Sequence, residues 1–288
     1  MAALAALRTL TGKTDGDQSA PRGYQRRRYS FPVWRWVTLL VAGLFFLVPL
    51  GAAVRFAGTS AFPALFKQGG FWPSIWLSLR LAAATWLVTM VLMVPTTVYV
   101  HLRMPRVRRL LESLTILPIV IPPIVLGVGA LDVMPVSLRA SVWLLGLLYV
   151  ILGLPFAYRA IDAGLRAIDV KTLTEASNSL GAGWLTTLWR VILPNMRTAL
   201  LSATILIVAL VLGEFTLASI FLQQTFPVWI VNFDQLNANI SVAASMFALF
   251  VTWILLMLIT VIGSRQSRRT GGAEVTLFTV APRNTIGN

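Results

Sequence analysis

The sequence contains no cysteine and only one histidine, His101, among its 288 residues. Without cysteine the chain has no disulfide, no thiolate metal ligand and no cysteine nucleophile. With a single histidine it offers no cluster of histidine ligands of the kind that binds zinc. The phosphate-binding pattern G-x-x-x-x-G-K-[ST] is also absent. ATP hydrolysis by a P-loop is therefore excluded for this chain.

Charged residues are scarce, because they make up 12% of the chain while hydrophobic residues make up 57%. Soluble domains carry about a quarter charged residues. The mean hydropathy of +0.78 and the long apolar runs indicate a chain embedded in a membrane. The net charge is +14, from 24 Lys and Arg against 10 Asp and Glu. Such an excess is typical either of a nucleic-acid-binding protein or of the basic flanks of membrane helices.

The apolar runs predict an all-α integral membrane protein with a transmembrane domain over residues 34–265. Each run has the roughly 20 residues that cross a hydrocarbon core of ~30 Å. The third run contains Pro118, Pro122 and Pro123, which predicts a broken helix. The first run is too long for the hydrophobic part of a signal peptide and is interpreted as a span. The six predicted spans are about 36–54, 74–100, 113–131, 140–158, 198–222 and 241–263.

Lys and Arg are distributed unevenly between the segments that join the spans. Twenty lie in the N-terminal tail to Arg35, the 101–111 loop, the 159–197 interval and the C-terminal tail, against three in the opposite loops. The positive-inside rule therefore places both termini and the 159–197 interval in the cytoplasm. Residues 1–33, basic and disordered, and 266–288 are predicted to be cytoplasmic tails. His101 is expected to be a solvated residue beside the basic 101–111 loop. Since the basic charge follows the topology, no nucleic-acid partner is expected.

The interval 159–197 has features of a folded segment, which we place at 169–196. Thr172 and Glu175 form the pattern T-x-x-E, a capping box that predicts a helix start. Gly181 can adopt positive φ at the helix end. An amphipathic stretch follows Gly183, and Pro194 predicts the junction to the fifth span, because the residue before a proline is pushed away from helical geometry. By physical chemistry alone, a docking element and an ordinary helical loop fit this segment equally well.

The same segment resembles a signature of permease subunits of binding-protein-dependent ABC importers. That signature reads E-A-A, three residues, G, nine residues, I-x-L-P, and here it departs only at Ser177 and Val191. The signature falls between the last two predicted spans, as it does in that family, so the resemblance covers roughly residues 70–265. The matching residues are Glu175, Ala176, Gly181, Leu193 and Pro194.

This resemblance implies a type I importer permease with six spans in the inner or plasma membrane of a prokaryote. It implies that residues 169–196 couple the spans to a cytoplasmic ABC ATPase dimer, which binds ATP and Mg²⁺, so that this chain is not an enzyme and binds no cofactor. The further partners implied are a second permease subunit, identical or different, and an extracytoplasmic solute-binding protein. Alternating access would then be a shift between two packings of the spans.

Glu214 is the acidic residue that lies within a predicted span. It stands about 16 residues into the fifth span, roughly 24 Å from the cytoplasmic end at 1.5 Å per residue. A carboxylate at that depth is costly and usually faces a cavity or a partner. Glu214 is therefore a candidate for the substrate path, with a structural ion pair, for example with Arg80, as the alternative.

The cargo is suggested by a weaker resemblance. The segments LGEFTLASIF, around Glu214, and IPPIVLGVGAL are similar to permeases of spermidine and putrescine importers. This resemblance implies a polyamine-like organic cation. Ferric iron, thiamine, an aminophosphonate or a sugar is the alternative within the same importer class. A secondary carrier independent of ATP is a distant alternative, since no inverted repeat is evident.

Overall fold

The computed structural model describes residues 33–139 and 141–271, and every regular element in this part of the chain is a helix. The chain divides into two compact units, residues 1–49 and 50–288. The predicted tails fall largely outside the described residues, except that the last helix continues to Gly271. The first helix, α2 (Val33–Ala57), begins in the first unit and contains Pro49 at the boundary.

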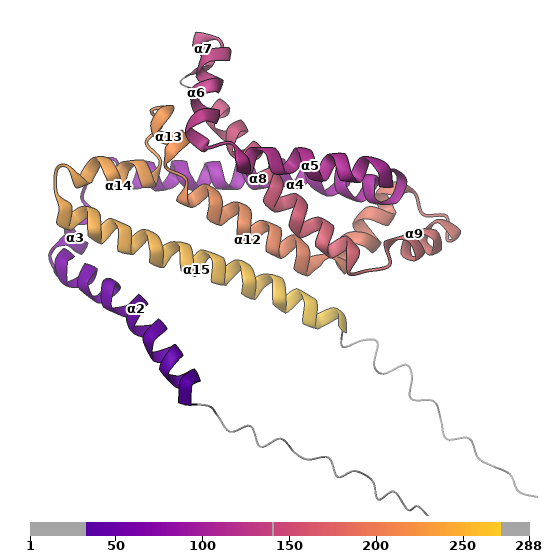
Figure 1. Ribbon diagram of the computed structural model, residues 1–288, viewed down its shortest axis with the longest axis horizontal. Coiled ribbons are helices and arrows are strands. Elements are labelled where there is room, and N and C mark those ends of the chain that lie inside the picture. Colours follow the sequence, from indigo (N-terminus) through magenta and orange to yellow (C-terminus); the bar gives the residue numbers. More distant parts are fainter. Residues whose placement is uncertain (1–32, 140, 272–288) are drawn as a thin grey trace, which may run out of the picture. The chain divides into compact units, whose positions relative to one another are not determined.

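The second unit contains the remaining helices, several of which run lengthwise beside one another (Figure 1). In chain order they are α3 (Ala61–Leu65), α4 (Phe71–Arg103), α5 (Pro105–Val120), α6 (Pro123–Val133), α7 (Val136–Arg139), α8 (Val142–Arg166), α9 (Val170–Ser179), α10 (Trp184–Thr187), the π-helix η1 (Leu188–Ile192), α11 (Leu193–Asn195), α12 (Arg197–Gly213), α13 (Thr216–Ile220), α14 (Phe226–Asp234) and α15 (Ala238–Gly271).

The helices of the described residues include five that are long and apolar enough to cross a membrane, or six if one bent pair is a single span. The all-α membrane fold with up to six spans is therefore confirmed. The bent pair is α5 and α6, which meet at 96°. At the break, Ile121 and Pro122 are extended, with ψ of 120° and 136°. The cause is the proline pair, because each proline removes a backbone donor and disfavours helix in the residue before it.

The predicted basic loop over 101–111 is wrong. Residues up to Arg103 form the last turn of α4, and α5 begins at Pro105 after the single residue Met104. Proline is well tolerated at the first position of a helix, where its missing N–H would have no partner in any case. The basic residues of this stretch therefore lie on two packed helices, which fixes their positions relative to the rest of the bundle.

Helix α8 lies at the centre of the bundle, since it packs against α4, α5 and α12. A side chain at Gly146 would approach Leu81 and one at Gly153 would approach Thr89, so α8 and α4 run in the same direction. Gly164 of α8 lies so close to Ala199 of α12 that a Cβ would overlap it. Such small residues let helix backbones approach closely in membranes. With Gly153 also beside Ile207, α12 runs antiparallel to α8.

Candidate functional site

The helix of the candidate segment, α9, begins one turn earlier than its capping pattern predicted. Asp169 is the N-cap: its Oδ1 accepts from the Thr172 N–H at 3.2 Å and its Oδ2 from the Thr172 hydroxyl at 2.7 Å. The hydrogen bonds from Thr172 lower the pKa of Asp169 below its ordinary value. Glu175 therefore lies inside the helix, where its carboxylate is 4.0 Å from the Lys171 ammonium. The predicted capping box is wrong, because the acidic residue at 169 competes successfully for the same backbone donor.

The end of α9 has the backbone conformation that the glycine predicted. Gly181 has φ of +79°, a region that costs other residues strain. Its N–H donates to the Asn178 carbonyl at 2.9 Å, and the N–H of Ala182 donates to the Ser177 carbonyl at 3.1 Å. These two bonds form a Schellman motif, which satisfies the last carbonyls of the helix. The chain therefore reverses sharply at Gly181.

A buried hydrogen bond joins α9 to α10. The hydroxyls of Ser177 and Thr187 lie 2.9 Å apart, and the Thr187 hydroxyl also donates to the Gly183 carbonyl at 3.1 Å. Both side chains are buried. Sequence comparison treated Ser177 as a minor departure from the third residue of E-A-A. In the structure its hydroxyl fixes the position of α9 relative to α10.

The return of the chain to α12 differs from the junction expected at Pro194. Leu193 is helical, with φ of −57° and ψ of −43°, and the helix breaks at Met196 instead. Pro194 lies in the first turn of α11, where its missing N–H is tolerated. The preceding π-helix η1 widens the backbone spacing next to the proline. The prediction of a non-helical residue before Pro194 is therefore wrong.

The predicted coupling residues fall into two groups. Glu175, Ala176 and Gly181 are exposed along α9 and its terminal turn, and the neighbouring Leu180 is 89% exposed. Leu193 and Pro194 are half-buried where the segment rejoins the bundle. The buried Val170 and Ile192 anchor the two ends of the segment. An exposed helix with fixed ends is thus available to a partner, while its role in binding one stays a prediction.

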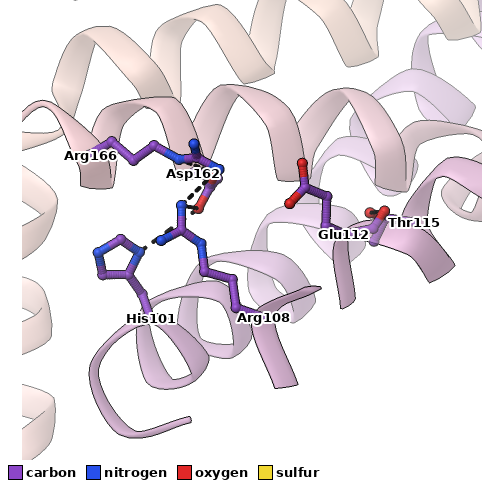
Figure 2. A network of polar contacts seen from close by, with 6 residues as sticks. All are labelled: His101, Arg108, Glu112, Thr115, Asp162 and Arg166. Carbon is purple, nitrogen blue, oxygen red and sulfur yellow. Dashed lines mark hydrogen bonds and ion pairs between the residues drawn. The ribbon is translucent and has the colours of Figure 1, made fainter. Parts of the chain in front are cut away.

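Near the start of this segment, a carboxylate that no sequence pattern singled out joins two helices and lies beside a third (Figure 2). Asp162 of α8 has a side chain only 8% exposed, and its oxygens lie 2.9 Å from Arg108 of α5 and 2.7 Å from Arg166 of α8. His101 of α4 lies 3.8 Å away with 20% of its side chain exposed. The expectation that His101 is a solvated residue is therefore wrong. We call these four residues the Asp162 cluster.

Part of the Asp162 cluster could have been found in the sequence. Asp162 and Arg166 are four residues apart, a spacing that places opposite charges together on a helix. The pairing with Arg108 crosses 54 residues and no sequence pattern predicts it. Figure 2 also shows Glu112 on α5 near the cluster. Glu112 is exposed and forms no ion pair with any described residue.

Glu214 lies at a break in the fifth predicted span. Helix α12 ends at Gly213, and Glu214 is extended, with ψ of 122°. Its carboxylate accepts from the Leu217 N–H at 3.0 and 3.1 Å and from the Ala218 N–H at 3.3 Å, in the first turn of α13. Glu214 therefore acts as a helix cap, and its place in the substrate path stays a prediction.

The ion pair suggested between Glu214 and Arg80 is absent from the described part of the chain. The Arg80 guanidinium instead lies 5.0 Å from the centre of the Trp76 ring. Its side chain is exposed on α4. Among the described residues no group of three or more His, Cys, Asp or Glu could hold a metal ion.

The sequence is similar to those of known transport proteins. Residues 93–271 match the family described as binding-protein-dependent transport system inner membrane component. The chain is 29% identical over 196 residues to the molybdenum transport system permease protein ModB of Mycobacterium tuberculosis, covering 63% of this chain and 74% of that protein. It is 27% identical over 241 residues to a probable molybdenum ABC transporter permease of Haloferax volcanii, covering 78% and 89%.

The chain also matches part of an iron permease, and its fold is similar to that of a solved transporter structure. The chain is 34% identical over 103 residues to an Fe(3+)-transport system permease of Haemophilus influenzae, covering 36% of this chain and 20% of that protein. The fold is similar to a chain of a bacterial ABC transporter involved in the import of the acidic polysaccharide alginate, with a TM-score of 0.62, 14% identity, and coverage of 82% and 94%. At that identity the structural likeness shows the fold, which is that of a type I importer permease.

Proposed function

This chain belongs to the family of binding-protein-dependent transport system inner membrane components, and we propose that it is the permease subunit of an ATP-driven importer. A cytoplasmic ATPase dimer, which binds ATP and Mg²⁺, docks on the exposed surface of α9. A second permease subunit completes the translocation path, and an extracytoplasmic binding protein delivers the solute. The observation that carries the proposal is α9 itself, an exposed helix whose flanking residues Val170 and Ile192 are buried in the bundle.

In this proposal each residue of the signature has a mechanical role. Glu175 presents its exposed carboxylate to a basic residue of the ATPase, and Ala176 allows close approach beside it. Gly181 forms the reversal that exposes the end of the helix. Leu193 and Pro194, half-buried at the return to α12, pass the displacement to the membrane helices.

For the cargo we propose an inorganic oxyanion such as molybdate. The two relatives described above, which each match more than 60% of this chain, carry molybdenum in their names, and dissolved molybdenum at neutral pH is an oxyanion. The Glu214 carboxylate, which suggested a cationic cargo, is hydrogen-bonded within the protein. Its oxygens accept backbone N–H groups, so its charge is partly neutralised by the start of α13.

The polyamine-like cation is the second candidate, supported by the likeness of LGEFTLASIF to spermidine and putrescine permeases. Ferric iron is the third, supported by the shorter match to the Haemophilus influenzae permease. Thiamine, aminophosphonates and sugars rest on membership of the importer class alone. These candidates differ in charge and size, so a transport assay separates them directly.

The test is transport by the permease in liposomes with its cognate ATPase and binding protein. We expect uptake of molybdate that requires ATP and exceeds uptake of putrescine and of ferric iron measured in parallel. Preferential uptake of putrescine would restore the cation proposal. Uptake by the permease alone, without ATP, would contradict the importer proposal.

Docking on α9 is tested separately by co-purification. Glu175→Arg reverses the exposed charge and is expected to weaken association with the ATPase about tenfold, the equivalent of about 1.4 kcal/mol. Glu112→Arg is the matched control, since Glu112 is also exposed and lies on α5. Equal loss of the ATPase in both variants would place the docking surface elsewhere.

A further inference from the structure

In the Asp162 cluster a single buried carboxylate pairs with two arginines, and a histidine lies 3.8 Å from it. Arg108 comes from α5, Arg166 from α8 itself and His101 from α4. A buried ion pair is weak evidence for stability, since apolar packing often serves a fold as well or better. In some proteins, buried polar groups are retained because they specify one packing of the elements that they join. During transport, the Asp162 cluster would therefore keep the helices that it joins in one arrangement.

The cluster lies next to the candidate coupling segment in the chain. Helix α8 ends at Arg166 and α9 is capped by Asp169, so only Ala167 and Ile168 separate the cluster from that cap. Such a short connection cannot absorb a large displacement, because two residues span at most about 7 Å when fully extended. Movement of α9 would therefore pull on the last turn of α8, where Asp162 lies.

The contacts of α8 also determine which helices would move with it. On its other side, α8 is fixed to α12 by the close approach of Gly164 and Ala199. The ion pair from Asp162 to Arg108, at 2.9 Å, joins α8 to α5. Beyond Val120, α5 continues through the 96° break into α6. A pull on α8 would thus reach the broken span through Arg108.

We propose that Asp162 is a positioning residue that transmits movement of α9 to α5 during the transport cycle. This inference rests on the proposed function, in which the ATPase displaces α9. Arg108 is the essential partner because it belongs to another helix. Arg166 binds the same carboxylate from within α8 and so carries no movement between helices.

The two arginines supply a matched pair of variants. Arg108→Gln removes the tie between helices, while Arg166→Gln removes an ion pair to the same carboxylate within one helix. In liposomes containing the full importer, we expect Arg108→Gln to lower the molybdate transported per ATP hydrolysed by about fivefold or more, the lower range of coupling between distant sites. Arg166→Gln is expected to stay within about twofold of the unmodified protein. Arg108→Lys, which keeps the charge, should restore part of the loss.

A second measurement does not depend on the ATPase or on the cargo. Because the chain has no cysteine, spin labels can be placed at Asn178→Cys on α9 and Ser113→Cys on α5, both at exposed positions. In the purified permease, Arg108→Gln should broaden the distribution of distances between these labels, and Arg166→Gln should leave it unchanged.

The outcomes separate this inference from the proposed function. If no ATPase associates with the unmodified protein, the proposed function fails, and the label distances still decide whether Asp162 ties α9 to α5. Equal broadening by both arginine variants, or no broadening by Arg108→Gln, would overturn the inference. Equal loss of coupling in both variants would also overturn it, since a general loss of stability would then be the cause.

Discussion

Asp162 and Glu214 are both carboxylates in apolar parts of the chain, one on α8 and one at the break after α12, yet their charges are stabilised in different ways. Asp162 pairs with arginines from two helices, α5 and α8, and lies near His101 of a third. Glu214 accepts from backbone N–H groups three and four residues further along its own chain. Because α8 and α12 are antiparallel, Asp162, near the end of α8, and Glu214, just after the end of α12, lie toward opposite ends of the bundle. The first arrangement is tertiary, so its loss separates helices, while the second is local and its loss affects one turn.

Removal of each carboxylate should reveal the difference between the two arrangements most clearly. Asp162→Ala leaves Arg108 and Arg166 without their buried partner and is expected to cost about 3–5 kcal/mol, as for other broken buried pairs. Thermal unfolding of the purified protein in detergent measures the effect. Glu112→Ala, on the exposed part of α5, should change the melting temperature little. Similar shifts for the two variants would show that the Asp162 cluster adds no tertiary stability.

Glu214→Ala should cost less, about 1–2 kcal/mol, the range for loss of a helix cap. Glu214→Gln keeps an oxygen acceptor for Leu217 and removes the charge, so it should melt closer to the unmodified protein and still associate with the ATPase. We expect solute uptake by the importer that contains Glu214→Gln to fall, because Glu214 is a candidate for the substrate path. Unchanged uptake by Glu214→Gln would leave Glu214 with the cap as its only role.

A smaller effect is expected at the exposed end of α9. Gly181→Ala places a side chain at φ of +79°, which costs about 1 kcal/mol. Amide hydrogen exchange at Ala182, whose N–H closes the Schellman motif, should speed up about fivefold in response. Gly183→Ala is the control, since Gly183 has φ of −76° and open space around it. Equal changes at both positions would contradict a specific role for the left-handed turn.

The smallest effect concerns the cap at Asp169. The hydrogen bonds from Thr172 lower the pKa of Asp169 below 3.8 in the folded protein. The contribution of Asp169 to stability is therefore complete above the pKa that this group has in the unfolded protein. It is lost as the pH falls through the lower pKa of the folded protein. A spin label at Asn178→Cys should become more mobile as the pH is lowered from 6 to 3, while the same label in Asp169→Asn should respond less. Identical profiles would assign the change to another group.

The spans could be predicted from the sequence because hydropathy depends on local composition. The break near Pro122 and the left-handed turn at Gly181 were also predictable, since proline and glycine restrict the backbone wherever they occur. The start of α9 was not. Asp169 and Thr172 are both good caps, and their sequence does not determine which one begins the helix.

The Asp162 cluster was not predictable for a different reason. Its central bond joins residues 54 positions apart, and the side chains meet only because α5 packs against α8. The expected loop over 101–111 also argued against a pairing of Arg108 with a buried carboxylate, since the residues of a flexible loop would have faced water. Composition places charges near a membrane surface, but packing decides which of them become partners.

The separation of Arg108 and Asp162 also has a consequence for biosynthesis. At about 5–20 residues per second, the ribosome adds the 54 residues between them in roughly 3–11 seconds. During that interval Arg108 has been made and its carboxylate has not. The ion pair between Arg108 and Asp162 can therefore form only after α8 has been synthesised.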